Sequence, residues 1–286
     1  DGVGRPFGDD YINYWSAAVL AWSGRAAEIY DLGAFHAFQT GVVGPTLQGY
    51  HYSYPPVLLV LSAPLALLPY VPGLAAWLGA SWFAFYRALR EAAPRHALLL
   101  SLATPAVFIN AVGGQNGAWT AALMGGGLAL LDRRPILAGG LFGLLVYKPH
   151  LALMLPVALL AGRRWRAFCA AGSVASALVL LSSALFGLDA WRDYLDTADY
   201  MRRVILEDGA GVWHRMVSVF AAARRLGLQI SAAYVVQAFA ALAAALIVAA
   251  AWARDAAPPL RNAVVVLGAL LATPYLQDYD LVVTAF

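Results

Sequence analysis

The sequence predicts an all-α integral membrane protein, and composition, hydropathy and the pattern of apolar runs carry that prediction. Of the 286 residues, 62% are hydrophobic and only 12% are charged, whereas soluble domains average about 25% charged residues. The mean hydropathy is +0.67. These few ionisable groups cannot cover the water-facing surface of a 30.4 kDa soluble protein. A soluble globular fold is therefore excluded.

Charge and cysteine content exclude further classes of protein. The net charge is +3, but the basic residues lie in short loops between apolar runs, which is a membrane pattern and not a nucleic-acid-binding one. The lone cysteine, Cys169, allows neither an intrachain disulfide nor a thiolate metal site. The chain starts at Asp1 without methionine and stops at Phe286 inside an apolar run, which predicts a stretch trimmed at both ends.

Apolar runs bounded by proline, glycine or charge predict the membrane helices, which need about 20 residues for a full crossing. We expect helices at 71–88, 97–112, 116–131, 135–147, 149–161, 166–187, 229–252 and 262–276. Two of these, 135–147 and 149–161, are short, so we expect either half-helices that meet at Lys148 and Pro149 or spans that end where polar protein or water thins the membrane. Either arrangement is typical of a segment that lines a cavity. Residues 57–69 are bounded by prolines and are predicted to be short or re-entrant.

The chain is predicted to form one membrane domain over residues 1–286, because no soluble domain boundary is evident. Residues 1–55 and 188–228 read as outer loops, and residues 56–187 and 229–286 as membrane helices. Aromatic residues at helical spacing predict interfacial helices over 11–22, 32–43 and 212–226.

Arginines set the predicted orientation, because cytoplasmic loops retain positive charge. Loops 87–96, 132–134, 162–166 and 253–261 hold most of the bases and are assigned to the cytoplasm. The outer face then receives residues 1–55, the turn at 113–116, Lys148, residues 188–228 and the aspartates at 278 and 280. The predicted location is the inner, or cell, membrane, with the active face toward the periplasm or exterior.

Asp9 and Asp10 are the first candidate catalytic residues. They directly precede the first aromatic helix, where an aspartate is a preferred N-cap. A carboxylate at the membrane surface can also serve as a general base for an acceptor hydroxyl. Both interpretations stay open.

Lys148 is the only lysine and interrupts an apolar run immediately before Pro149. The proline disfavours helix at Lys148, and a cation at a helix break in a membrane suggests an anion site. The alternative is a lysine that snorkels to the interface. His150, two residues later, is either a buried hydrogen-bonded histidine or a contact to the substrate.

Polar residues of two other segments are candidate ligand contacts. Gln115 and Asn116 form a polar turn that can bind sugar hydroxyls or cap a hairpin. His214, Arg215, Arg224 and Arg225 flank a short amphipathic run on the predicted outer face. Arginines there suit a lipid phosphate, with simple headgroup contact as the alternative.

The order of several motifs resembles glycosyltransferase family 87, a family of membrane transferases. The motifs are GDDYINYWSAA, EIYDL, Tyr52-Ser53-Tyr54-Pro55-Pro56, Gly114-Gln115-Asn116, Tyr147-Lys148-Pro149 and Gly162-Arg163-Arg164-Trp165. The resemblance implies a GT-C type multi-span helical bundle with a catalytic aspartate and interfacial helices in its first outer loop. One departure is visible, since the family often has an asparagine where this chain reads His214-Arg215-Met216.

Carried over by position, the resemblance implies that Asp10 is the family's aspartate, with Asp9 as its neighbour. It further implies donor-phosphate contacts from Lys148, Arg215, Arg224 and Arg225. The remaining implied contacts, to the sugar or acceptor, are Gln115, Asn116, Tyr14, Tyr54, His150 and His214.

The implied function is transfer of a hexose such as mannose, or a pentose, from a polyprenyl-phosphate donor to a glycolipid or glycan in the bilayer, with inversion. Neither a cofactor nor a metal is predicted, although the carboxylates of Asp9, Asp10, Asp278 and Asp280 are candidates to converge on a divalent ion. The main rival is a secondary transporter or lipid flippase, since broken helices with a charge near mid-membrane also mark transport sites. A structural scaffold is a third alternative, and it leaves Lys148 unexplained.

Overall fold

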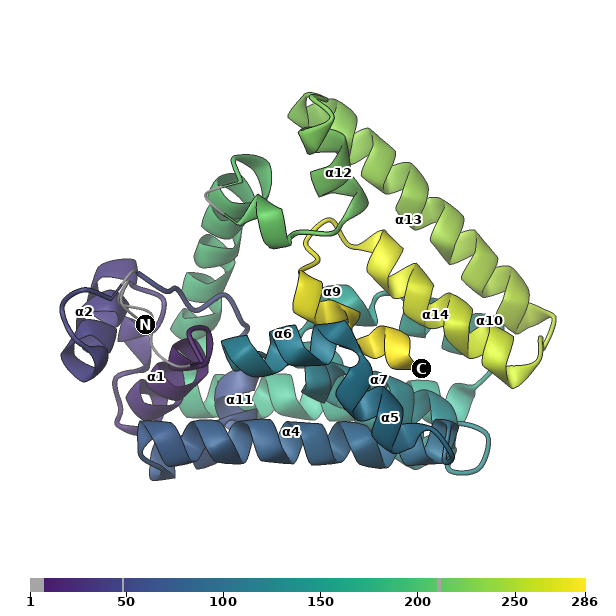
Figure 1. The fold of residues 1–286 in the computed structure, drawn as a ribbon, viewed down its shortest axis with the longest axis horizontal. Coiled ribbons are helices and arrows are strands. Elements are labelled where there is room, and N and C mark those ends of the chain that lie inside the picture. The colour runs from purple at the N-terminus through teal and green to yellow at the C-terminus, as the bar shows by residue number, and fades with distance from the viewer. Residues whose placement is uncertain (1–7, 48, 210–211) are drawn as a thin grey trace.

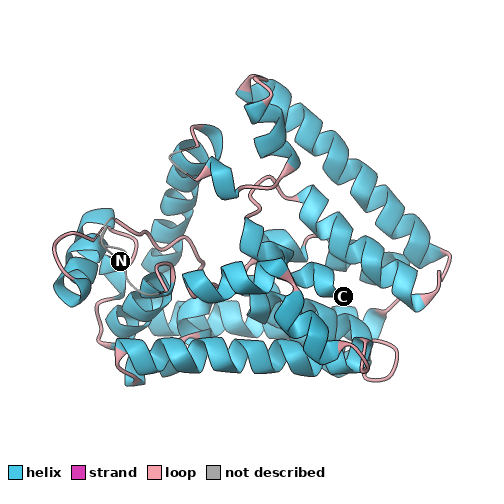
Figure 2. Ribbon diagram, in the orientation of Figure 1, coloured by secondary structure: helices cyan, strands magenta, loops and turns pink. Residues whose placement is uncertain are grey.

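The computed structural model describes residues 8–47, 49–209 and 212–286, and the regular elements in this part of the chain are all helical (Figures 1 and 2). This confirms the predicted all-α class. The α-helices are α1 (Tyr11–Trp22), α2 (Leu32–Val43), α3 (Val57–Leu61), α4 (Tyr70–Ala92), α5 (Ala97–Ala103), α6 (Pro105–Gly113), α7 (Gly117–Leu130), α8 (Pro135–Leu144), α9 (Pro149–Ala152), α10 (Met154–Ala161), α11 (Trp165–Met201), α12 (Val219–Arg225), α13 (Ile230–Ala253) and α14 (Pro258–Ala272). Shorter helical turns are η1 (Ala26–Glu28), η2 (Ala63–Leu67), η3 (Leu145–Tyr147), η4 (Arg202–Glu207), η5 (Trp213–Arg215) and η6 (Asp278–Ala285).

Prolines divide two of the predicted helices. The predicted helix 97–112 is two helices, α5 and α6, because Pro105 holds Thr104 in an extended conformation (ψ 120°). The predicted helix 149–161 is likewise divided into α9 and α10, since Pro156 lacks the N–H group that would bond to the carbonyl of Ala152. Residues 57–69 form the short pieces α3 and η2, as expected.

Helix α11 continues beyond residue 187, where the sequence predicts the end of a helix. The helix bends at Gly187, whose φ of 82° and ψ of 165° are not helical, and then continues to Met201. Figure 1 shows this second limb at a steep angle to α4. It runs on into the π-helical turn η4, so half of the expected loop is a helix that forms one wall of the molecule.

Helix α1 forms where the aromatic residues at helical spacing predict a helix, and one of its faces packs inside the protein. Tyr11 and Tyr14 are almost fully buried, and their rings pack on Trp77 of α4 at centroid distances of 6.4 and 5.3 Å. Tyr11 and Tyr14 form part of the core between α1 and α4. This packing fixes the backbone that carries Asp10.

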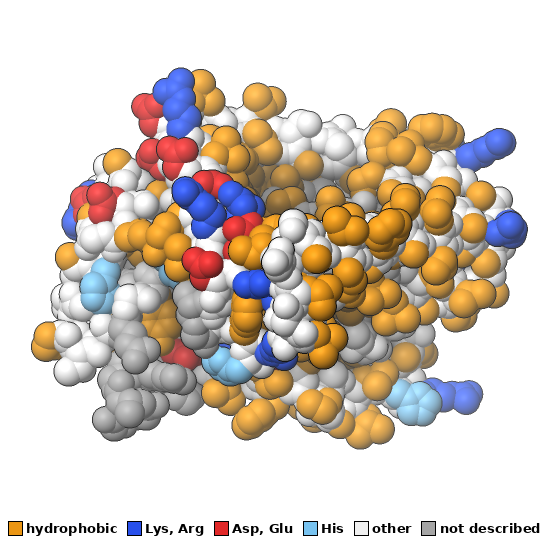
Figure 3. All heavy atoms as spheres, turned by 90° about the horizontal axis from the view of Figure 1, so that it is seen from above, with side chains coloured by type: hydrophobic (Ala, Val, Ile, Leu, Met, Phe, Trp, Pro, Cys, Tyr) orange, Lys and Arg blue, Asp and Glu red, His pale blue; other side chains and the backbone are white. Residues whose placement is uncertain are grey.

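The fold presents apolar surface suited to lipid. The limbs of α11 and η4 together (residues 165–207) and helix α13 are long and apolar enough to cross a membrane, and α7, α8 with η3, α9 with α10, and α14 are shorter apolar helices. Helix α13 packs on α14, and its outer face exposes Phe239, Leu242 and Leu246. Figure 3 shows hydrophobic side chains spread over the right of the view with basic side chains at its far edge, and a group of acidic and basic side chains left of centre. The chain is an all-α membrane protein.

The arginine-rich loops that were predicted to share one face are joined by ion pairs. Arg164, before α11, pairs with Asp132 at 3.1 Å and with Asp255 at 3.4 Å. Arg261 contacts the same two aspartates. A further pair links Arg133 to Glu91 at 2.9 Å. All four loops assigned to the cytoplasm therefore lie at one end of the helices.

Gly117 allows η6 to pack against the first turn of α7. A methyl group at Gly117 would overlap the backbone oxygen of Tyr279 and lie 2.9 Å from Oδ1 of Asn110. We expect Gly117→Ala to lower the free energy of unfolding by about 1–3 kcal/mol. The control is Gly140→Ala in α8, where no atom lies within 4 Å. Thermal unfolding in nanodiscs measures both, and equal melting temperatures for the two variants would contradict the prediction.

Candidate active site

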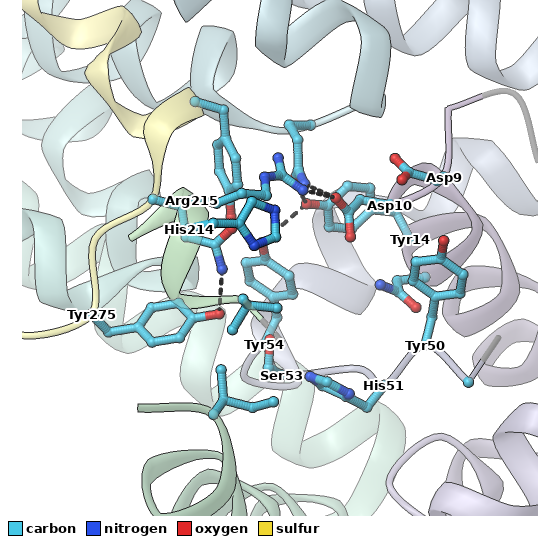
Figure 4. A pocket seen from close by; sticks show the side chains of 17 residues that line it. Asp9, Asp10, Tyr14, Tyr50, His51, Ser53, Tyr54, His214, Arg215 and Tyr275 are labelled. Carbon is cyan, nitrogen blue, oxygen red and sulfur yellow. Dashed lines mark hydrogen bonds and ion pairs between the residues drawn. The ribbon is translucent and has the colours of Figure 1, made fainter. Parts of the chain in front are cut away.

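A polar cavity of about 340 Å³ lies where segments far apart in the sequence meet (Figure 4). We call it the polar cavity. Every segment that lines it belongs to the face predicted to be the outer one. Its lining residues are Asp9, Asp10, Asn13, Tyr14, Gly49, Tyr50, His51, Ser53, Tyr54, Gln115, Ile205, Val212, His214, Arg215, Tyr275, Gln277 and Tyr279.

Asp10 is fixed at the edge of this cavity by both its backbone and its side chain. It occupies the N-cap position of α1 without a side-chain capping bond, and its N–H group donates to the carbonyl of Gly113 at 3.1 Å. Its Oδ2 atom accepts from Gln115 Nε2 and from Arg215 Nη1 at 3.2 Å. Within the described part of the chain, Oδ1 has no hydrogen-bond partner. One carboxylate oxygen is therefore held by two donors on the wall of the polar cavity.

Gln115 is placed by the turn between α6 and α7. Gly114 adopts a left-handed conformation (φ 65°), which suits glycine and turns the chain so that Gln115 reaches Asp10. The hydroxyl group of Tyr14 donates to Gln115 Oε1 at 3.0 Å and lies 3.0 Å from the hydroxyl oxygen of Tyr54. The structure thus brings together four residues that the sequence singled out.

The environment of Asp10 raises the pKa of its carboxyl group to about 6. Removal from water is the largest cause, and the negative charge of Asp9 adds to it. Arg215 and the hydrogen bond from Gln115 act in the opposite direction. The carboxyl group is consequently ionised at neutral pH, yet more basic than an ordinary aspartate, which suits a general base.

Arg215 of η5 joins Asp10 to the C-terminal segment. Its Nε and Nη2 atoms each lie 3.4 Å from a carboxylate oxygen of Asp278, while Nη1 binds Asp10. The guanidinium side chain remains 24% exposed. A cation with part of its surface free beside a carboxylate can bind the phosphate of a ligand.

A second cavity of about 210 Å³ adjoins the first and shares Ser53, Tyr54, Tyr275 and Tyr279 with it. We call it the adjoining cavity. The second limb of α11 forms one side of it, through Ala198, Met201 and other residues. His150 also lines this cavity, and its Nε2 atom has no hydrogen-bond partner among the described residues.

Lys148 is buried, which contradicts the snorkelling alternative. Its side chain is only 1% exposed and forms an ion pair with Asp280. Its Nζ atom also donates to Oδ1 of Asn116 at 2.9 Å. Lys148 borders only the adjoining cavity, and the fully buried Asn116 lines neither of the two cavities.

Of the basic residues predicted in residues 212–226, Arg215 and His214 line the polar cavity. Arg224 instead donates to the backbone oxygens of Leu228 at 2.7 Å and Glu207 at 3.2 Å. Arg225 is exposed and lines neither cavity. Arg224 therefore connects the loop before α13 to the end of η4.

The aspartates considered for a divalent ion are separated by cations. Asp10 and Asp278 share Arg215, and Asp280 is bound to Lys148. Among the described residues, no group of three or more His, Cys, Asp or Glu side chains is placed to hold a metal ion.

Several lining residues were missed in the sequence analysis, namely Asn13, His51, Tyr275, Gln277 and Tyr279. The last three follow α14, where Pro274 ends an apolar helix and a polar, aromatic string begins. That abrupt change in composition is the sequence feature that indicates a functional segment after Pro274. Only the folded chain shows that this segment packs beside the N-terminal one.

Comparison with known proteins tests the resemblance. The family model of glycosyltransferase family 87 matches residues 52–274, which is well over half of the chain. No curated protein and no solved structure matches the chain. Asp10, Asp278 and Asp280 lie outside the matched range. The helical membrane fold and this match agree, and the chain belongs to glycosyltransferase family 87.

Proposed function

We propose that this glycosyltransferase moves a sugar from a polyprenyl-phosphate donor to a hydroxyl group of a glycolipid or glycan, with Asp10 as the general base. The observation that carries the proposal is the environment of the Asp10 carboxyl group. One of its carboxylate oxygens is held by Gln115 and Arg215, the side chain lines the polar cavity, and its pKa is raised to about 6. Family membership favours this function over the transporter and flippase alternatives.

The two cavities support a lipid-linked donor. The adjoining cavity is bordered by Ala198 and Met201 of the second limb of α11 and opens beside Tyr54 and Tyr279, which also line the polar cavity. We assign the first isoprenoid units of the donor to the adjoining cavity and its sugar to the polar cavity. The donor phosphate then lies at their junction within reach of Arg215.

In the proposed reaction, Oδ1 of Asp10 accepts the proton of the acceptor hydroxyl group as that oxygen bonds to the anomeric carbon. The bond from the anomeric carbon to the phosphate oxygen breaks, and its electron pair leaves with the polyprenyl phosphate. Arg215 stabilises the charge that develops on this phosphate. Tyr14, Tyr54 and His214 are assigned to sugar or acceptor contacts. A single displacement inverts the anomeric configuration.

The proposed sidedness follows from the loops. The four arginine-rich loops gather at one end of the helices, and cytoplasmic loops retain positive charge. The polar cavity is lined by the segments assigned to the opposite face. We therefore assign the active site to the periplasmic or exterior face of the cell membrane.

The test uses the protein in lipid nanodiscs with a panel of radiolabelled polyprenyl-phosphate sugars and a membrane-lipid acceptor fraction. We expect transfer from at least one donor and an inverted anomeric configuration in the product. A retained configuration would overturn the single displacement. Movement of lipid across a vesicle bilayer, without any transfer of sugar, would overturn the proposed function.

The pH dependence of transfer follows from the raised pKa of Asp10. Because the ionised carboxylate is the active form, we expect the rate to rise with pH through about 6 and to level off above it. We call the part of the pH profile in which the rate rises with pH the acid limb. In Asp9→Asn the neighbouring negative charge is lost, so the pKa of Asp10 falls and the acid limb moves to lower pH. Rates measured at saturating donor between pH 4 and 8, about two pH units on either side of that pKa, check the wild-type profile and its shift in Asp9→Asn. A limb that stays in place in Asp9→Asn would contradict the electrostatic explanation.

A further inference from the structure

We infer that Lys148 and Asp280 form a buried positioning pair that sets the geometry of Arg215 and Asp10, and that Lys148 does not itself bind the donor phosphate. The inference rests on the proposed function. It gives Asp280 a role other than binding a metal ion, and it gives Lys148 a role other than binding the donor phosphate.

Most of the hydrogen-bonding capacity of Lys148 is already used within the protein. A lysine ammonium group has three N–H donors. Here one contacts Asp280 and one contacts Asn116 Oδ1 at 2.9 Å. The Nζ atom also lies 4.5 Å from the ring centroid of Tyr279, in a cation–π contact. Two of the three donors of Lys148 are thus used within the protein, the ammonium group lies against the Tyr279 ring, and the side chain is only 1% exposed, an arrangement that suits an internal ion pair and not a phosphate site.

Asp280 joins Lys148 to the first turn of η6. One of its carboxylate oxygens binds Lys148, and the other accepts from the backbone N–H group of Gln277 at 3.2 Å. The side chain of Gln277 caps the same turn. Asp280 is 1% exposed, so the first turn of η6 is fixed from inside the protein.

The first turn of η6 in turn holds Arg215. The Tyr279 ring contacts both cations, and its centroid lies 5.8 Å from Cζ of Arg215 and 4.5 Å from Nζ of Lys148. The carboxylate of Asp278 binds Arg215, and Arg215 binds Asp10. A continuous series of contacts thus runs from the helix break at Lys148 to the proposed base.

Neutral replacement of one or both partners tests the inference, because losing one partner leaves the other charge buried and unpaired, whereas losing both does not. We expect Lys148→Met and Asp280→Leu each to lower kcat about a hundredfold through displaced reacting groups, with little change in the donor KM. The double variant is expected to recover kcat to within about tenfold of wild type. A second pair, Lys148→Gln with Asp280→Asn, keeps hydrogen bonding and covers the case in which the first pair fails to fold.

The outcomes separate the inference from the proposed function. A donor KM that rises in every variant lacking Lys148, with no recovery of kcat in either double variant, would show that Lys148 binds phosphate and would overturn the inference alone. A wild-type protein that binds the donor but transfers no sugar would overturn the proposed function, and the inference with it. The acid limb of the pH profile is a further readout, since a shifted Arg215 changes the pKa of Asp10 and the limb must move in both single variants.

The matched control is Arg261→Met. Arg261 is a buried cation, with its side chain 4% exposed, and is paired with Asp132 and Asp255 at the end of the helices that carries the arginine-rich loops. Its loss should lower the melting temperature without moving the acid limb. A limb displaced equally in Arg261→Met and Lys148→Met would reduce the effect at Lys148 to general destabilisation and overturn the inference.

Discussion

Asp10→Asn is expected to lower kcat for sugar transfer about a thousandfold, which is within the range for loss of a general base. The amide keeps the size of the side chain and can still accept from Gln115 and Arg215 through its oxygen. It cannot take a proton from an acceptor hydroxyl group. The loss should therefore fall on kcat, while the donor KM changes little.

The neighbouring carboxylate provides the comparison for Asp10→Asn. Asp9→Asn removes the same charge one residue earlier, but Asp9 is not joined to Gln115 or Arg215 in the structure. We expect its effect on kcat at neutral pH to stay within about tenfold. Initial rates with labelled donor, together with donor binding to both variants, measure the difference. Equal losses in Asp9→Asn and Asp10→Asn would mean that the structure identifies the wrong base.

The sequence predicted the fold class and most helix positions because apolar periodicity and prolines act locally. Hydropathy alone predicts single helices across Pro105 and Pro156, because it does not register the missing N–H group of a proline. The helix over 188–201 was missed for a different reason. Its charged residues resemble those of a loop, and only Gly187 marks where the helix bends.

The sequence indicates some of the residues that line the polar cavity, and the others depend on long-range contacts. Asp10, Gln115 and Tyr14 were found because each belongs to a recognisable local motif. Asp280 lies 132 positions from Lys148, and no local pattern indicates which charge will neutralise a buried lysine. The same limit explains Arg224, which resembles Arg215 in the sequence but contacts backbone oxygens in the structure.

Arg215→Met is expected to lower kcat about a hundredfold or more, the cost of removing one electrostatic contact to a developing charge. The donor KM should rise as well, because the guanidinium group would bind the phosphate in the ground state too. A third effect follows from the geometry. Arg215 lowers the pKa of Asp10, so its loss raises that pKa above about 6 and moves the acid limb to higher pH.

This shift in the acid limb distinguishes a direct charge interaction of Arg215 with Asp10 from a purely structural role of Arg215 in its loop. Asp9→Asn and Arg215→Met change opposite charges beside the same carboxyl group, so their limbs must move in opposite directions. Arg203→Met is the control, because Arg203 is exposed and pairs with Asp199 outside the polar cavity. Profiles of kcat against pH for the three variants at saturating donor make the comparison. Limbs that move in the same direction in Asp9→Asn and Arg215→Met would contradict a direct charge interaction with Asp10, because structural loosening does not depend on the sign of the charge removed.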